Sequence, residues 1–206
     1  MNIDSTRRAI RVAALILPLT WIPSLVEGQT AKAASFGVAV STATINQQSA
    51  SAVAPAEGGM SDAEAGDVTI ASLVTAQDAK AIAGGLSDGA HSDAVSSATL
   101  GKLSILGGVI TADGIVAMAT STPGQSDAAG SGFSNLVVNG VGMSAAAPNT
   151  RVALPGAGYA VLNEQIATAG GMTVNMIRVV LQQPTLLGGY QTVGSIIVGS
   201  ASSSVN

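Results

Sequence analysis

The sequence predicts an all-β protein, an antiparallel β-sandwich of short strands. Runs of β-prone apolar residues recur roughly every 8–15 residues, and Gly, Asn and Asp residues suited to tight turns separate them. No fixed period of 20–50 residues repeats along the chain, which argues against a repeat architecture. A β-solenoid is the alternative for Leu103–Thr120, where the apolar runs are very short.

The first third of the chain mixes clear and ambiguous segments. Ala34–Thr44 is expected to form the first strand, because apolar Phe and Val residues alternate with small ones. The stretch 45–66 is rich in Gln, Ser, Ala, Gly and Pro, and predicts a polar loop. Val68–Ile82 suits a strand at its start, but its later alanines would tolerate a helix. Ala94–Leu100 is again expected to be extended. The simplest arrangement of Val68–Ile82 and Ala94–Leu100 is a hairpin.

The middle of the chain predicts four short strands, which are Leu103–Leu106, Val109–Ala112, Ile115–Thr120 and Phe133–Val138. Gly107-Gly108 indicates a turn or a bulge. Asp113-Gly114 between two apolar runs indicates a tight turn, because both central residues of a type I′ turn need positive φ. The polar, Gly-rich stretch 121–132 is expected to be a loop.

The last third is the clearest. Tyr159–Ile166 and Thr173–Leu181 are expected to be strands joined by a turn that contains Gly170-Gly171. Val193–Ala201 predicts the final strand, and 202–206 a disordered tail.

The N-terminus has the pattern of a secretory signal peptide over residues 1–33. Three arginines precede the 15-residue apolar run Val12–Val26, which small residues follow. A membrane-spanning helix needs roughly 20 apolar residues, and two prolines interrupt this run, so it is short for a permanent anchor. The pattern places the mature protein outside the cell or in the cell envelope.

Cleavage after Ala33 fits Ala31 and Ala33 as the small residues at positions −3 and −1. A cut after Gly28, with Val26 at −3, competes with it. Arg7-Arg8 partly resembles a twin-arginine signal, so both the general secretion route and the twin-arginine route remain open. The chain has no cysteine, which excludes a lipoprotein anchor.

Residues 34–206 are long enough for one β-rich domain. Removing residues 1–33 takes away four of the eight basic and two of the twelve acidic residues, leaving a net charge of about −6. Such a chain would repel nucleic-acid phosphates, and it has no basic cluster to hold it on an anionic membrane. Without disulfides and with few aromatic residues, it is expected to have a thin core rich in Ala and Val.

The segment from Ala147 to Ala201 carries a family resemblance. The runs Ala147-Pro148-Asn149-Thr150, Tyr159–Gln165, Gly171–Val179 and Ile196–Ala201 resemble the choice-of-anchor P family of bacterial exported proteins. The resemblance implies an exported domain of unknown biochemical role that one of several surface anchors can follow, and it implies no catalytic residues. The chain departs from that arrangement because Ser202–Asn206 holds no sorting motif, hydrophobic tail or basic end.

Acidic residues and one histidine are the candidate metal ligands. Asp62, Glu64 and Asp67 could supply carboxylates to a loop-built calcium site, although their spacing does not match an EF-hand loop. His91, the only histidine, is flanked by Asp88 and Asp93 and could join a metal site or a catalytic triad. Its neighbouring turn residues favour an ordinary solvated loop position.

Asn163, Glu164 and Gln165 form the most polar run within an expected strand. Alternation places Asn163 and Gln165 on one face and Glu164 on the other. They suit either a polar contact patch or hydrogen bonds to a neighbouring strand or loop, and the second interpretation is favoured. Glu164 has no evident carboxylate partner for glycosidase chemistry.

The sequence therefore predicts a secreted or cell-surface β module with a structural or interaction role of the adhesion or assembly type. Its expected partners are proteins, glycans or copies of itself, without nucleic acid, cofactor or lasting membrane span. A secreted hydrolase or a calcium-dependent binding protein is the alternative function.

Overall fold

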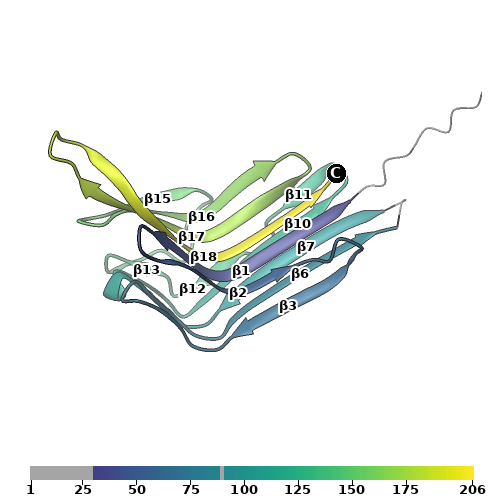
Figure 1. Ribbon diagram of the computed structural model, residues 1–206, viewed down its shortest axis with the longest axis horizontal. Coiled ribbons are helices and arrows are strands. Elements are labelled where there is room, and N and C mark those ends of the chain that lie inside the picture. Colours follow the sequence, from purple (N-terminus) through teal and green to yellow (C-terminus); the bar gives the residue numbers. More distant parts are fainter. Residues whose placement is uncertain (1–29, 89–90) are drawn as a thin grey trace, which may run out of the picture.

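The computed structural model describes residues 30–88 and 91–206 and is an antiparallel all-β sandwich, as the sequence predicts (Figure 1). The predicted features within residues 1–29 lie outside the described part of the chain. In chain order the strands are β1 (Ala31–Thr42), β2 (Asn46–Val53), β3 (Gly59–Ala65), β4 (Val68–Ile70), β5 (Val74–Ala76), β6 (Ala79–Ser87), β7 (Ser92–Leu100), β8 (Leu103–Ile105), β9 (Ile110–Ala112), β10 (Gly114–Thr122), β11 (Gln125–Asp127), β12 (Gly132–Ser134), β13 (Val137–Val138), β14 (Val141–Gly142), β15 (Thr150–Leu154), β16 (Gly158–Thr168), β17 (Gly171–Pro184) and β18 (Tyr190–Val205).

One layer of the sandwich is a single six-stranded sheet in the order β15-β16-β17-β18-β1-β2. Its long strands β17 and β18 pair along almost their whole length, and β1 from the start of the domain pairs with β18 from its end. The first and last strands of the domain therefore lie side by side in the middle of this sheet. The 14 residues of β17 and 16 of β18 also correct the expectation that the strands are short.

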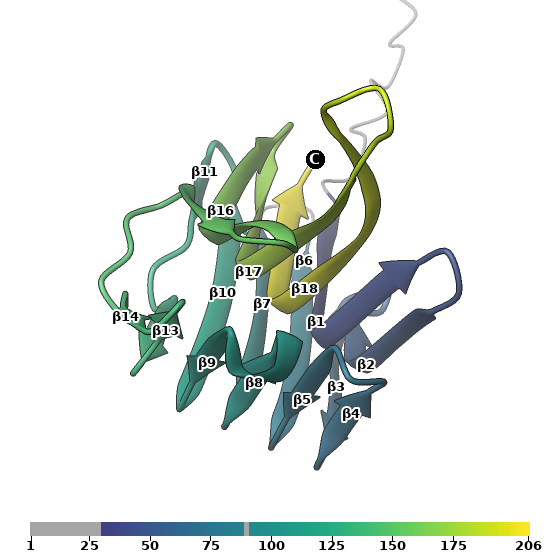
Figure 2. The ribbon, with the colours of Figure 1, turned by 90° about the vertical axis from the view of Figure 1, so that its left-hand side faces the viewer.

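The other layer consists of a second sheet (β11-β10-β7-β6-β3, with β12 beside β10) and a third (β14-β13-β9-β8-β5-β4). These two sheets continue one another, because the chain passes directly from β3 to β4, β5 to β6, β7 to β8, β9 to β10 and β12 to β13. Figure 2 shows the third sheet running on from the ends of the second. Each junction takes one or two residues, and together the junctions mark a line across the layer.

The first sheet is kinked along a matching line, which we call the crease. Flanking pairs place Asn163, Met176, Gly199, Gly37 and Ala50 opposite one another on β16, β17, β18, β1 and β2. Three of the five, Asn163, Gly199 and Ala50, have positive φ. The bend lies midway along β17 and β18 in Figure 1. Both layers are thus bent together.

The two layers touch at the crease because its glycines leave room. A Cβ on Gly37 would lie 3.1 Å from Cβ of Ala79, at the start of β6, and a Cβ on Gly199 would lie 2.9 Å from Cγ2 of Ile115, at the start of β10. Strands β6 and β10 both begin at the junction line of the opposite layer. The kink of one layer therefore sits on the kink of the other.

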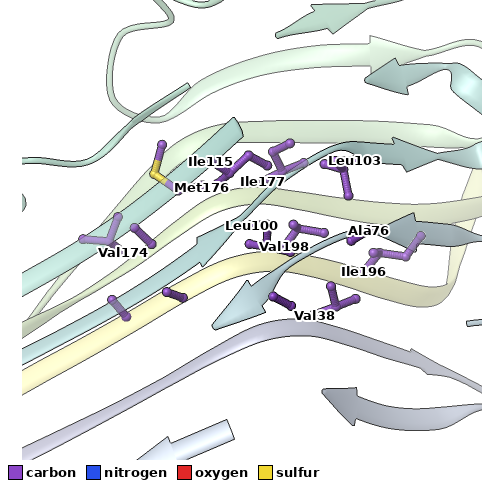
Figure 3. Packing of buried hydrophobic residues seen from close by; sticks show 14 of the residues in the cluster. Val38, Ala76, Leu100, Leu103, Ile115, Val174, Met176, Ile177, Ile196 and Val198 are labelled. Atoms are coloured by element: carbon purple, nitrogen blue, oxygen red, sulfur yellow. The ribbon is translucent and has the colours of Figure 1, made fainter. Parts of the chain in front are cut away.

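On the side of the crease toward the end of β17 and the start of β18, the first sheet packs on the third sheet through large side chains. We call this part the Ile/Leu half. Its interior holds Val38, Ile105, Ile110, Leu136, Leu154, Leu162, Ile177 and Ile196, all 1 % exposed or less. Figure 3 shows side chains from both layers meeting in this cluster near Ala76 and Leu103. Burial at about 25 cal/mol per Å² of apolar surface makes this half the main hydrophobic contribution to folding.

On the other side of the crease, the first sheet packs on the second through small side chains, and we call this part the Ala/Ser half. Its buried residues include Ala33, Ser35, Ala81, Ala83, Ala94, Ser96, Ala117, Ala119, Ser121, Ala201 and Ser203. The layers lie so close that Ser35 Oγ–H donates to the carbonyl of Ile82 at 2.9 Å and Ser96 Oγ–H to that of Ser202 at 2.9 Å. The thin Ala-rich core expected from the sequence is confirmed here.

Two expected irregular segments are strands. The predicted loop 45–66 contains β2 and β3, and the polar stretch 121–132 contains β11. Strands β2 and β3 lie at the edges of their sheets, where one face meets solvent and polar residues can alternate with small ones, which are buried in β2 and half-buried in β3. The composition that suggested a loop is therefore that of half-exposed edge strands.

The predicted disordered tail 202–206 is also wrong. Residues up to Val205 belong to β18 and pair with β1 on one side and β17 on the other. The short serine side chains fit between closely spaced layers, and Ser203 and Val205 are buried. Serine-rich composition here reflects thin packing.

Asp113-Gly114 is not the tight turn that the sequence suggests. It lies at the junction between β9 and β10, where the strand passes from the third sheet to the second without reversing, and Asp113 N–H donates to the carbonyl of Ser134.

The expected hairpin pair is β6 and β7. Because Leu103–Thr120 forms antiparallel strands of two sheets, it is part of the sandwich and not of a solenoid. In the described ranges no helix reaches the length and hydropathy of a membrane span.

Candidate functional site

The ends of β17 and β18 extend beyond the rest of the first sheet as a two-stranded ribbon, Gln182–Thr192. Pairing of β17 with β16 ends at Leu181, and pairing of β18 with β1 ends at Gly194. Past these points β17 and β18 pair with each other and with no other strand of the described ranges: Gln182 pairs with Thr192, Gln183 with Gln191 and Pro184 with Tyr190. Figures 1 and 2 show the ribbon projecting from one end of the molecule.

The tip of this ribbon exposes large apolar side chains. Leu186 and Leu187 are fully exposed, and Tyr190 is 74 % exposed. The turn closes through Thr185, whose backbone N–H donates to the carbonyl of Gly189 and whose hydroxyl donates to that of Gly188. The turn bonds hold the backbone, so the two leucines are presented on a closed turn without contributing to the core.

A hollow of about 400 Å³ lies at the base of the ribbon. Its lining combines the β15–β16 turn with the ribbon, and consists of Ala153, Leu154, Pro155, Gly156, Ala157, Gly158, Gln182, Pro184 and Tyr190. No charged residue is among them. The tip and this hollow form one uncharged surface, which we call the ribbon surface.

A buried polar network lies nearby, on the face of the first sheet that points away from the core. Asn175 stands between the core residues Val174 and Met176, so alternation puts its side chain on the opposite face. Asn175 Nδ2–H donates to Glu164 Oε2 at 2.8 Å, and Ser200 Oγ–H donates to Asn175 Oδ1 at 2.8 Å. The row thus crosses three neighbouring strands.

Arg178 completes this network. Its Nε–H donates to both carboxylate oxygens of Glu164 at 2.8 Å, and its second terminal nitrogen lies 2.6 Å from Oε1. The hydrogen bond to Glu164 and its charge, together with Tyr159, raise the pKa of Arg178 despite partial burial. Tyr159 is in turn covered by Arg151, whose guanidinium carbon is 3.7 Å from the ring centroid. In the described part of the chain no buried side-chain nitrogen or oxygen lacks a hydrogen-bond partner, and this row joins β16, β17 and β18 by side-chain bonds.

The backbones of Asn163 and Gln165 hydrogen-bond a neighbouring loop, whereas their side chains, which were expected to make such bonds, bond each other. Gln165 Nε2–H donates to Asn163 Oδ1, which agrees with one shared face, and Gln165 N–H donates to Asn149 Oδ1. Asn149 N–H donates to the carbonyl of Asn163. Asn149 therefore fastens the loop before β15 to the backbone of β16.

The acidic candidates are spread along an edge. Asp62 and Glu64 lie on β3 with exposed side chains, and Asp67 lies between β3 and β4. Glu64 Oε1 is 2.8 Å from Nζ of Lys80 on β6, and this hydrogen bond and charge raise the pKa of Lys80. Within residues 30–88 and 91–206, no three His, Asp or Glu side chains gather closely enough to hold a metal ion.

His91 lies between β6 and β7 with an exposed side chain. Its backbone N–H donates to Asp88 Oδ1 at 2.7 Å, and its ring Nδ1 is 3.7 Å from the same oxygen. This is the solvated loop position that the flanking turn residues indicated.

Ala33, the predicted residue before the cleavage point, is buried in β1 opposite Ser203.

A family model described as a domain of unknown function, DUF8256, matches residues 30–154, more than half of the chain. The chain belongs to this family. The family description assigns no activity. Most of the segment that resembles the choice-of-anchor P family lies beyond the match, and nothing in the match connects the two families. Comparisons with curated proteins and with solved structures give no match.

Sequence reasoning missed the ribbon surface and the partner of Glu164. Gln182–Gly189 has the composition of a loop, and the exposed pair Leu186-Leu187 within it was the available signal. Arg178 and Asn175 stood out as polar residues in an apolar strand, but pairing them with Glu164 needs the register of β16 on β17.

Proposed function

We propose that the protein is an exported contact module of the adhesion or assembly type that binds its partner through the ribbon surface. The observation that carries the proposal is the full exposure of Leu186 and Leu187 at the tip of a projecting ribbon. Exposed apolar patches on a stable domain mark sites of interaction, because leaving them in water costs free energy that a partner recovers. The two leucines bury no surface in the folded domain, so binding of a partner would explain why large apolar side chains stand at this position.

The chemistry of the ribbon favours an apolar protein partner. The segment 182–192 carries no charged side chain, which offers nothing to an anionic lipid headgroup or a nucleic acid. Tyr190 beside the leucines adds the kind of aromatic anchor that is enriched at binding hot spots.

The backbone of the ribbon favours a second copy of this chain as that partner. Among the described residues, no strand pairs with either edge of the ribbon beyond Leu181 and Gly194, and on these edges Gln182 N–H donates to the carbonyl of Ala157. Such edges are templates for pairing with another strand, and two ribbons could pair edge to edge while burying their tips. Export is supported by the arginines, apolar run and small residues of segment 1–33.

The test is light scattering after size-exclusion chromatography of the purified protein over a range of concentrations. We expect the mass to rise with concentration for the natural sequence and to stay monomeric for Leu186→Ser/Leu187→Ser. Because both side chains are exposed, the melting temperature of this variant should not change.

The matched control is Met60→Ser/Val141→Ser, which removes two exposed apolar side chains elsewhere. This variant should associate like the natural protein. A natural protein that stays monomeric at its highest soluble concentration would refute self-assembly. Equal association of the natural protein, the tip variant and the control variant would refute the role of the ribbon tip.

A further inference from the structure

We propose that the leader is removed after Gly28, so that the mature chain begins at Gln29 and keeps β1 whole. This inference rests on the export proposed above and names its processing site. The competing site, after Ala33, lies three residues inside β1 (Ala31–Thr42).

Residues 30–33 are integral to the first sheet. Thr30 N–H donates to the carbonyl of Asn206 at 2.9 Å, and Asn206 N–H donates back to the carbonyl of Thr30 at 3.1 Å. Ala31, Lys32 and Ala33 pair with Val205, Ser204 and Ser203. A cut after Ala33 would leave the last residues of β18 without a neighbour on this side.

The same residues are packed against β2 and the second sheet. Ala33 is 4 % exposed, and its carbonyl accepts the N–H of Ala54 at 2.9 Å. The carbonyl oxygen of Ala31 lies so close to Gly85 of β6 that a Cβ there would be 3.3 Å from it. Loss of residues 30–33 would thus expose backbone groups of three strands and open the Ala/Ser half at its end.

The family domain begins in the same place. The match starts at residue 30, one residue before β1, so residues 30–33 belong to the recurring domain. Strand β1 and the family match therefore begin within one residue of each other, at residues 31 and 30.

The sequence before this boundary can be processed there. Gly28 supplies the small residue at −1 and Val26 the residue at −3, directly after the apolar run Val12–Val26. On the general secretion route a signal peptidase acts on the extended precursor before folding, so burial of Ala33 does not protect it from cleavage on that route. What favours Gly28 is that it is the candidate site that spares the strand.

The experiment expresses the full chain in a bacterial host, collects the exported protein and reads its N-terminus by sequencing and intact mass. We expect Gln29 as the first residue. An N-terminus at Ala34 with normal export would overturn the inference but leave export standing. A chain that keeps Met1 inside the cell would overturn both.

Two variants separate the sites. Gly28→Leu puts a large residue at −1 of the proposed site and should abolish the product that begins at Gln29. Ala31→Leu puts a large residue at −3 of the competing site and should leave that product unchanged. On the general secretion route cleavage precedes folding, so the readout there does not depend on the stability of either variant. Loss of processing in Ala31→Leu alone would overturn the inference.

Discussion

At the scale of single residues, the structure solves the problem of a buried carboxylate in a protein with few charges. Glu164 is 6 % exposed, and burying an unpaired charge costs several kcal/mol. Arg178 and Asn175 supply donors to both of its oxygens. These donors compensate the carboxylate for the water that it loses on burial. Removing one of them should therefore leave a buried charge without its partner and destabilise the fold.

Arg178→Met is expected to lower the free energy of unfolding by about 2 kcal/mol, less than for a fully buried pair because Arg178 is one third exposed. The measurement is equilibrium urea unfolding. Arg151→Met is the matched control and should cost less than about 1 kcal/mol, since Arg151 only covers a ring. In Glu164→Gln/Arg178→Met the loss should be smaller than the sum of the single losses, and additive losses would contradict the coupling.

At the scale of elements, the crease depends on the glycine at position 199 for two reasons. Gly199 has a φ of 63° in the middle of β18 and faces Ile115 of the opposite layer. A side chain there would meet both backbone strain and a close contact.

We expect Gly199→Ala to destabilise the protein by about 2–3 kcal/mol, of which the strain at positive φ accounts for about 1. Gly107→Ala is the matched control, because Gly107 has a similar φ of 66° but nothing within 4 Å of a new Cβ. It should cost about 1 kcal/mol. Urea unfolding of both variants checks this, and equal losses would show that the contact with Ile115 does not matter.

The elements also show how far sequence reasoning reaches. Strands with apolar alternation, such as β10, β16 and β17, could be predicted because one face of each meets the core. Polar edge strands β2 and β3 could not, since the small residues of their inner faces, buried in β2 and half-buried in β3, give no apolar signal. The buried serines of β18 likewise look like a tail, because thin packing accepts hydroxyls that find a partner across the layers.

At the scale of the whole molecule, the two halves set different limits on side-chain size. In the Ala/Ser half the layers are held close by serine bonds to the opposite backbone, whereas the Ile/Leu half is spaced by large side chains. The crease that separates them joins residues far apart in the sequence, one per strand. This is why no local pattern predicts the crease, whereas the ribbon, a local hairpin, was missed because Gln182–Gly189 has the composition of a loop.

Ala83→Leu in the Ala/Ser half is expected to cost about 3 kcal/mol or more, because the facing residues are small and the opposite backbone is close. Ala76→Leu, at a position equally buried in the third sheet, should cost about 1 kcal/mol, since larger side chains around it can repack. Thermal and urea unfolding provide the comparison. The opposite order would show that the layers are not closer in the Ala/Ser half.

The antiparallel pairing of β1 and β18 has a mechanical consequence. Thr30 lies at the end of the molecule opposite the ribbon, and β1 and β18 run side by side between the two ends (Figure 1). A pull between the start of β1 and the ribbon tip therefore acts along the strands, and it loads the hydrogen bonds of this ladder in shear. All of these bonds then share the force at once instead of opening one after another, so an anchored copy of the domain would resist tension best along this axis.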